Sequence, residues 1–286
     1  MLSVRGIKAR PHDIDLMVRR KPDLVEMHCS VQDLGWMPSR EFGCGLAIHI
    51  PEYHAGGADG GRLLDPASLD EQKRKDAEVI YVQAVGRAIA WADFFSQDIT
   101  GRPKVVFHPG GMDITKWEKS KREAAIAQLG KTITAMKKAA GDDVEILLEN
   151  MPTCCWFFGG NWFENIATDC RELRSICEAH GIGATLDLCH LHLASKADGF
   201  DPISDIAHIK PLVQHVHYSD AEGDCGEGLQ IGEGEMDIAA YFKPIMDLDV
   251  VAVPEIWFGH ENGGYGFTEA WRRTEELLPK VVAHGK

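Results

Sequence analysis

The sequence predicts an α/β fold, a single (β/α)8 TIM barrel in which residues 1–286 form one domain. Three observations lead to this prediction. The chain has 286 residues, an ordinary length for one such barrel. Eight short apolar runs alternate with helical segments, and eight parallel strands close a barrel. Seven successive runs end in a histidine, aspartate or glutamate, and the carboxyl ends of barrel strands carry the chemistry of this fold.

The eight expected strands are runs of aliphatic and β-branched residues that are too short for helices. They cover residues 3–8, 23–29, 45–50, 104–108, 144–150, 183–189, 213–219 and 250–257. Helical patterns lie between most of them, at residues 11–20, 68–95, 117–140, 165–180, 238–247 and 268–284. The segments after the second and sixth strands show no clear helical pattern.

An open, doubly wound sheet is the structural alternative. Such a sheet more usually has about five to seven strands and gathers its chemistry at one switch point. Polar strand ends spread over seven successive runs favour the barrel.

Composition excludes several function classes. The 30 basic and 44 acidic residues give a formal charge of −14, whereas a nucleic-acid binder normally carries a basic footprint. No run of eighteen apolar residues predicts a membrane span. The eight cysteines form no CxxC pair and the first residues contain no apolar signal-peptide core, so we expect free thiols and a cytoplasmic location.

The polar strand ends are the candidate functional residues. In a barrel they meet at one mouth, where buried carboxylates and imidazoles are costly without partners. Any one of them alone is more often structural, but a divalent cation is a common partner for the whole set. In chain order they are His28, His49, His108, Glu149, Asp187, His217 and Glu255.

The residue types indicate which metal is expected. Oxygen ligands from Glu149, Asp187 and Glu255 with one imidazole from His217 suit Mn²⁺, Mg²⁺, Co²⁺ or Zn²⁺ rather than a metal held by thiolates. We expect one such ion. Two interpretations of His49 and His108 stay open: they hold a second ion with Glu149 as the bridge, or they hydrogen-bond substrate and fix the ligands.

Six segments together resemble the xylose isomerase-like TIM-barrel superfamily. They are VVFHPGG, ILLENMP, ATLDLCHLH, HVHYSD, QIGEGEMD and VPEIW, and the likeness in order and spacing runs from about His49 to Glu255. That superfamily contains sugar and sugar-phosphate isomerases and epimerases, and also the endonuclease IV type of AP endonuclease.

The resemblance implies roles for particular positions. In the isomerases and epimerases, a Glu, Asp, His, Glu set on the last four strands binds one divalent metal. Matched by motif, the set is Glu149, Asp187, His217 and Glu255. The histidine three residues after the aspartate, here His190, contacts a substrate oxygen in those enzymes.

The endonuclease branch implies a different use of the histidines. There the equivalent of His190 helps to hold a third zinc, and His49 and His108 would belong to the first. That branch also has a D-x-H just before its GEG loop, but here the two ligand positions fall on Gly226 and Gly228. The third metal should therefore be absent, which weakens the case for phosphodiester cleavage.

The favoured function is a divalent-metal-dependent isomerase or epimerase of a small-molecule sugar or sugar phosphate. It would act through a metal-stabilised enediolate, with Glu149 and Glu255 as the acid/base pair and His190 bonded to the oxygen whose charge changes. Trp156 and Trp162 would pack on sugar faces. The alternative, to which we give equal weight, is that the aromatic residues in the segment after Glu149 form a lid on the barrel rim or a dimer contact.

Two other functions stay open. One is an endonuclease IV-like, metal-dependent phosphoesterase, and the other is a barrel that is non-catalytic or acts on another polyol-like compound. Asp220 either orients the His217 imidazole or caps the following turn. A homodimer is the ordinary expectation for an enzyme of this size.

Overall fold

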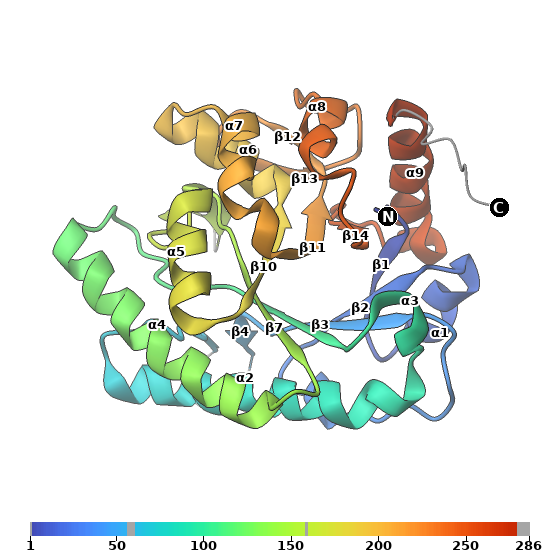
Figure 1. Cartoon of the computed structure of the whole chain (residues 1–286), viewed down its shortest axis with the longest axis horizontal. Helices are drawn as coiled ribbons and strands as arrows, with labels where there is room; N and C mark the ends of the chain where they lie inside the picture. The colour runs from blue at the N-terminus through green and yellow to red at the C-terminus, as the bar shows by residue number, and fades with distance from the viewer. Residues whose placement is uncertain (1, 56–60, 158–159, 279–286) are drawn as a thin grey trace.

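Eight parallel strands form a barrel in the computed structural model of the chain, which describes residues 2–55, 61–157 and 160–278 (Figure 1). Neighbouring strands pair in the order β1-β2-β3-β6-β7-β10-β11-β14, and each of these pairs is parallel. The strands are β1 Gly6–Ala9, β2 Leu24–His28, β3 Gly45–His49, β6 Lys104–Phe107, β7 Glu145–Glu149, β10 Gly183–Asp187, β11 Val213–Tyr218 and β14 Ala252–Pro254. The predicted α/β barrel is confirmed.

The barrel closes between its first and last strands. Ser3 bridges Val251 in parallel register, just before β1 begins. The amide of Ser3 donates to the carbonyl of Val250 at 2.9 Å, and the amide of Ala252 donates to the carbonyl of Ser3 at 2.7 Å. This closure excludes the open doubly wound sheet.

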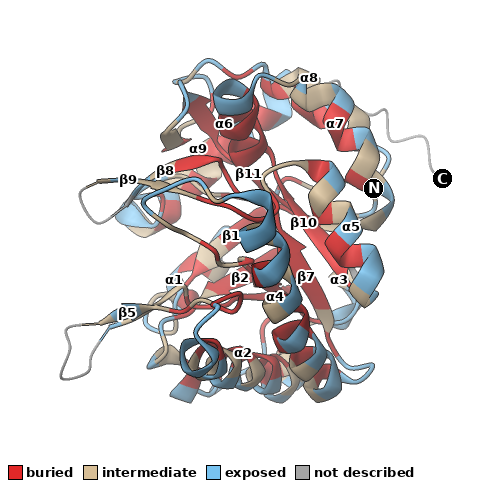
Figure 2. Cartoon of the chain, turned by 90° about the vertical axis from the view of Figure 1, so that its left-hand side faces the viewer, coloured by how far each residue is buried: buried red, intermediate tan, exposed pale blue. Residues whose placement is uncertain are grey.

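Helices cover the outside of the barrel (Figure 1). Each of the two helices α2 and α5 begins at an aspartate, Asp70 or Asp169, whose carboxylate accepts two amides of the first turn. Their inner faces are buried and their outer faces exposed (Figure 2). The α-helices are α1 Ile14–Met17, α2 Glu71–Trp91, α3 Gln97–Thr100, α4 Lys119–Ala140, α5 Cys170–His180, α6 Leu188–Asp198, α7 Pro202–Ile209, α8 Ile238–Phe242 and α9 Glu261–Leu277, and the 3-10 helices are η1 Val18–Arg20, η2 Asp33–Gly35, η3 Ala92–Phe94, η4 Lys210–Leu212 and η5 Lys243–Ile245.

The two links without a predicted helix have different structures. The short 3-10 helix η2 follows β2, whereas α6 and α7 follow β10. The predicted strand over residues 183–189 ends at Asp187, because the Asp187 carboxylate accepts the amide of His190 and begins α6. The last helix, α9, spans Glu261–Leu277 but is kinked near its start, because Asn262, Gly263 and Gly264 have positive φ angles; its regular part therefore begins after Gly264, near the predicted residue 268. Residues 279–284 of the prediction lie outside the described residues.

Three antiparallel hairpins follow β3, β7 and β11 on the side where these strands end. They are β4–β5 (Tyr53–His54 and Arg62–Leu63), β8–β9 (Cys154–Phe157 and Gly160–Phe163) and β12–β13 (Asp220–Glu222 and Gly226–Leu229). The aromatic run after Glu149 is therefore a hairpin, which projects beside the barrel strands in Figure 2.

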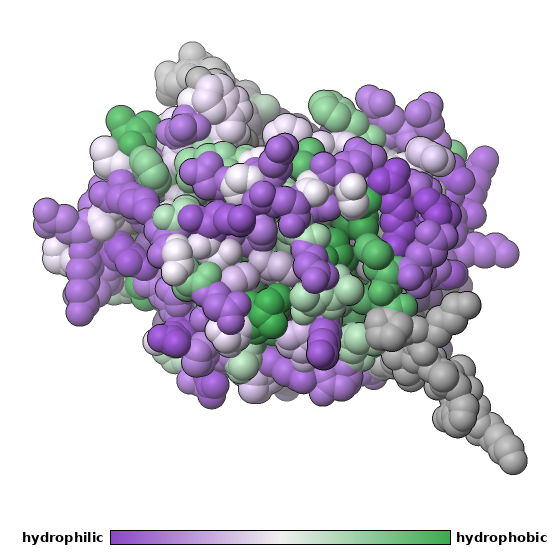
Figure 3. Space-filling model, turned by 90° about the horizontal axis from the view of Figure 1, so that it is seen from above, coloured by the Kyte–Doolittle hydropathy of each residue, from purple (hydrophilic) through white to green (hydrophobic). Residues whose placement is uncertain are grey.

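The surface agrees with the charged composition. Seen from above, it is largely hydrophilic, with small separate apolar areas (Figure 3). Among the helices that the structure describes, none combines the length and the apolar character needed to cross a membrane.

Candidate active site

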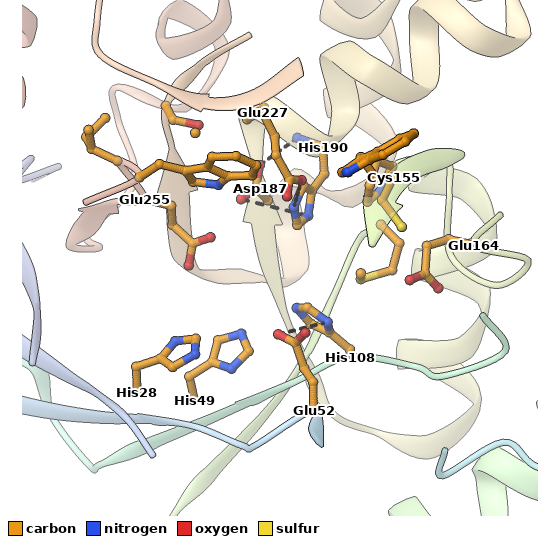
Figure 4. Close-up of a pocket in the computed structure, with 18 of the residues that line it drawn as sticks. His28, His49, Glu52, His108, Cys155, Glu164, Asp187, His190, Glu227 and Glu255 are labelled. Atoms are coloured by element: carbon orange, nitrogen blue, oxygen red, sulfur yellow. Dashed lines mark hydrogen bonds and ion pairs between the residues drawn. The ribbon is translucent and has the colours of Figure 1, made fainter. Parts of the chain in front are cut away.

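A cavity of about 280 Å³ opens at the carboxyl ends of the barrel strands. His28, His49, His108, Asp187 and Glu255 all line it, although they come from β2, β3, β10 and the segments after β6 and β14. Figure 4 shows them around one space. The structure thus brings together side chains that are more than two hundred residues apart in the sequence, such as His28 and Glu255.

Glu149, Asp187, His217 and Glu255 converge, as the sequence predicts. Each offers one ligand atom, and these four atoms all lie within 4.8 Å of one another. The His217 Nδ1 atom lies 3.2 Å from Glu149 Oε1, 3.2 Å from Glu255 Oε1 and 3.9 Å from Asp187 Oδ2. We call these four residues the carboxylate cluster.

The carboxylate cluster fits a divalent cation. Glu149 Oε2 is buried without a hydrogen-bond partner among the described residues. Burial raises the pKa of Asp187, and the neighbouring Glu149 and Glu255 carboxylates add to that shift although His190 opposes it. Three carboxylates and one imidazole are also the donor set that hard or borderline divalent ions bind. A cation at this position would therefore offset a concentration of buried negative charge.

Glu26 is a buried carboxylate that holds His217 from the opposite side. Its Oε2 atom lies 2.7 Å from His217 Nε2 and 2.8 Å from His215 Nε2, and Glu26 is fully buried. An imidazole that donates from Nε2 to Glu26 keeps its Nδ1 lone pair directed at the carboxylate cluster. The sequence analysis missed Glu26, although a charged residue two positions before His28 inside an apolar strand marks the same face.

Asp220 does not have the role of orienting His217. Its carboxylate accepts the amides of Ala221 at 2.9 Å, Gly232 at 2.8 Å and Met236 at 3.0 Å. Of the two interpretations, the structure supports capping, because the bonds to Gly232 and Met236 hold the turn that follows β13 against β12.

Lys8 is a second residue that the sequence analysis missed. Its ammonium group pairs with Glu255 Oε1 at the cavity wall. Burial opposes the charge on Lys8, but Glu255 and Glu26 raise its pKa above the usual range. Burial also opposes the charge on Glu255, yet His217 and Lys8 lower the pKa of that carboxyl to about 2. Glu255 is therefore a carboxylate at neutral pH.

Histidines occupy the other half of the mouth. His49 Nε2 and His108 Nε2 each lie 3.5 Å from Glu149 Oε2, and His108 Nδ1 lies 3.4 Å from Glu52 Oε1. The rings of His28 and His49 stack with centroids 5.0 Å apart. Ligand atoms of His49, Glu52 and His108 also lie within 4.8 Å of one another. One carboxylate oxygen of Glu149, Oε2, therefore faces His49 and His108, whereas the other, Oε1, faces His217 in the carboxylate cluster.

His190 lies between the carboxylate cluster and the cavity. Its Nδ1 atom is 3.0 Å from the carbonyl of Asn150, and its Nε2 atom is 3.7 Å from Glu227 Oε2 (Figure 4). Burial opposes its charge, but Asp187 and Glu149 raise the pKa of His190 well above its ordinary value. Because Nδ1 donates to the carbonyl of Asn150, the Nε2–H group is the one that can donate to a ligand in the cavity.

The two candidate tryptophans have different positions. Trp156 lines the cavity with 57% of its surface exposed, whereas the described lining residues do not include Trp162. Trp162 pairs with Cys155 across the β8–β9 hairpin. Trp257, which the sequence analysis did not select, lines the cavity as well.

The glycines in place of D-x-H are required by the local packing. A Cβ atom at Gly228 would lie 2.0 Å from Trp257 Cδ1, and Gly228 has a φ of +73°. A Cβ atom at Gly226 would lie 2.5 Å from the carbonyl oxygen of Glu222. The packing leaves no room for metal-ligating side chains at these two positions.

The chain matches a known family over most of its length. Residues 39–276 match the family model described as xylose isomerase-like TIM barrel. Among curated proteins, an uncharacterised protein of Methanocaldococcus jannaschii is 26% identical over 153 residues, which are 53% of this chain and 53% of the relative. The chain spans just over half the length of the curated relatives it matches.

Solved structures share the fold. A D-tagatose 3-epimerase-like protein superposes with a TM-score of 0.65 at 19% identity, covering 95% of this chain and 97% of the other. The 3-keto-D-glucoside 4-epimerase of E. coli gives 0.65 at 11% identity, over 96% and 99%. The IolI protein with a bound zinc atom gives 0.65 at 13% identity, over 97% and 99%.

Proposed function

The chain belongs to the xylose isomerase-like TIM-barrel family, and from this we propose that it is a divalent-metal-dependent isomerase or epimerase of a sugar or sugar phosphate. The observation that carries the proposal is the carboxylate cluster, whose four ligand atoms lie within 4.8 Å of one another. Epimerases and a zinc-binding protein among the structural neighbours support it.

The chemistry requires a proton to leave and return at a carbon beside a carbonyl. A divalent ion in the carboxylate cluster would stabilise the negative charge that develops on the enediolate oxygens. Glu255 lines the cavity and is ionised at neutral pH, and we propose it as the group that accepts the proton. Glu149 is fully buried behind the cavity wall, and we propose it as the second member of the acid/base pair.

The other residues would position the substrate. His190 would donate from Nε2 to the oxygen whose charge changes, since its Nδ1 atom is occupied by the Asn150 carbonyl. Trp156 and Trp257 would pack on the C–H faces of a sugar at the mouth. Trp162 would act only indirectly, through the hairpin that carries Trp156.

The cellular setting is also a proposal. All eight cysteines are free thiols, as a cytoplasmic location predicts. A homodimer stays a prediction, to be measured by light scattering.

Two measurements test the proposed function. Elemental analysis of protein purified without added metal should find one divalent ion per chain in the wild type and none in Asp187→Ala. Metal-loaded wild type in D₂O should place deuterium on the carbon beside the carbonyl of at least one ketose or ketose phosphate in a panel, as followed by ¹H NMR. Exchange that survives complete metal removal, or no exchange with any sugar, would contradict the proposal.

A metal-dependent phosphoesterase is the second candidate, and one observation favours it. His49 Nε2 and His108 Nε2 both face Glu149 Oε2 at 3.5 Å, which would suit a second ion bridged by Glu149. Two ions in the wild type that fall to one in His108→Ala, together with cleavage of abasic-site DNA, would move this candidate to the front. One ion per chain in both the wild type and His108→Ala would remove the support for a phosphoesterase.

A further inference from the structure

Glu164 is a buried carboxyl group that faces the cavity without a partner. It follows β9, is only 8% exposed and lines the cavity. Its amide donates to the carbonyl of Thr153 at 3.2 Å, but in the part of the chain that the structure describes its carboxyl group makes neither a hydrogen bond nor an ion pair. Leaving such a group unpaired is costly, so its position indicates that a ligand supplies the missing partner.

The surroundings of Glu164 disfavour an anionic ligand. Glu52 and Glu227 line the same cavity, and both the burial of Glu164 and the charge of Glu52 raise its pKa, which reaches about 8 although His108 opposes the shift. Lys8 is the single lysine or arginine among the described lining residues, and it is paired with Glu255. Glu255 lies across the cavity from Glu164 (Figure 4).

We propose that Glu164 binds a hydroxyl group at the end of the substrate that lies away from the carboxylate cluster, and that Glu52, Glu164 and Glu227 together exclude a phosphate there. A protonated Glu164 offers a hydrogen-bond donor and an acceptor, which is what a hydroxyl group requires. A phosphate group would bring between one and two negative charges into this acidic wall, where the basic side chains Lys8, His108 and His190 are already paired with carboxylates. This inference rests on the proposed function and narrows its substrate class to unphosphorylated sugars.

The test compares a panel of free ketoses with the matching terminal phosphates, using the metal-loaded full chain. The wild type should turn over at least one free ketose with a kcat/KM at least about tenfold above that of its phosphate. Glu164→Ala should raise KM for the free ketose about tenfold, with a smaller change in kcat. Glu164→Gln keeps the shape of the side chain but cannot ionise. At about pH 9, where the wild-type carboxyl is ionised, this variant should therefore reduce the ratio of kcat/KM for the free ketose to kcat/KM for its phosphate. A preference for the phosphate, or an unchanged KM in Glu164→Ala, would overturn the inference.

Glu145→Gln is the matched control, because it removes the same charge at the opposite end of the barrel. It should leave both the KM and the preference between sugar and phosphate at their wild-type values. A change as large as that of Glu164→Gln would show that the effect follows net charge rather than the cavity wall, and would overturn the inference.

Binding of inorganic phosphate separates this inference from the proposed function. If no sugar in the panel reacts, the isomerase proposal fails, but calorimetry of phosphate with the metal-loaded protein still tests the acidic wall. At about pH 9, above the Glu164 pKa of about 8, phosphate should bind at least about threefold more tightly to Glu164→Gln than to the wild type, since the negative charge of the ionised carboxylate is gone. Equal affinity in the two proteins would reject the role of Glu164.

Discussion

Strand β7 carries a glutamate at each end, and the two have opposite surroundings. Glu145, at the amino end, pairs with Arg102 on the surface, and the two side chains are 28% and 45% exposed. Glu149, at the carboxyl end, is fully buried among His49, His108 and His217. The residue type and the strand are the same, and only the position along the barrel axis differs.

The comparison shows where the fold concentrates charge. At the amino end, water and a flexible arginine satisfy the carboxylate, so the ion pair adds little stability. At the carboxyl end, strands β1, β2, β3, β7, β10 and β11 direct ionisable side chains into one region, and each of these groups depends on its neighbours for compensation. Substitutions at the mouth should therefore affect metal binding and turnover strongly, whereas substitutions at the amino end should change only the stability, and by a small amount.

The largest effect is expected for Glu149→Gln. Glu149 faces both the carboxylate cluster and the two histidines, so a neutral amide there should weaken metal binding and remove an acid/base group together. We expect turnover to fall by about 10²–10⁴-fold with little change in the far-UV circular dichroism spectrum. Steady-state kinetics on the metal-loaded protein measure the loss, and wild-type turnover in this variant would remove Glu149 from the acid/base pair.

Glu26→Gln should have the next largest effect. In the described part of the chain, Glu26 contacts the carboxylate cluster only through the His217 ring. The His217 Nε2 atom lies 2.7 Å from Glu26 Oε2. Loss of such a support typically weakens metal affinity by about 10–100-fold. Competition with a chromophoric chelator measures the affinity. An unchanged dissociation constant would show that the His217 orientation is set by the barrel alone.

The barrel and the strand ends could be predicted from the sequence, because each terminal residue directly follows an apolar run. His49, Glu149 and Asp187 are visible in this way without any tertiary information. The sequence also placed the D-x-H departure at Gly226 and Gly228, where the structure leaves no space for side chains.

Groups inside the strands could not be predicted in the same way. Glu26 meets His215 across a sequence separation of 189 residues, and only the closed barrel brings β2 opposite β11. The helix α6 was missed because residues 188–195 are all buried, so they show no apolar stripe with a 3.6-residue period. The cavity-wall residues Glu52 and Glu164 lie in loop segments, whose side-chain directions periodicity does not specify.

A pH-dependent effect on stability is expected for Glu164→Gln. The pKa of Glu164 is raised from 4.5 to about 8, mainly by burial. Between these two values the unfolded chain loses the proton while the folded chain keeps it, so the free energy of unfolding falls as pH rises. Glutamine has no such loss. The gain in thermal stability over the wild type should therefore be small near pH 5 and should grow up to about pH 8, as differential scanning calorimetry would show, and an equal gain at both values would contradict the burial of this group.

The smallest effect is expected for Glu145→Gln, which completes the comparison along β7. Its pair with Arg102 is solvent-exposed, and the Arg102 guanidinium also donates to the carbonyl of Asp142, so it keeps a partner when the carboxylate is lost. Exposed pairs of this kind contribute about 0–1 kcal/mol to the free energy of unfolding. Urea unfolding should find a change within that range, reduced further at high salt because the charges are screened. A larger loss that persists at high salt would mean that the amino end of the barrel relies on this carboxylate as strongly as the mouth relies on Glu149.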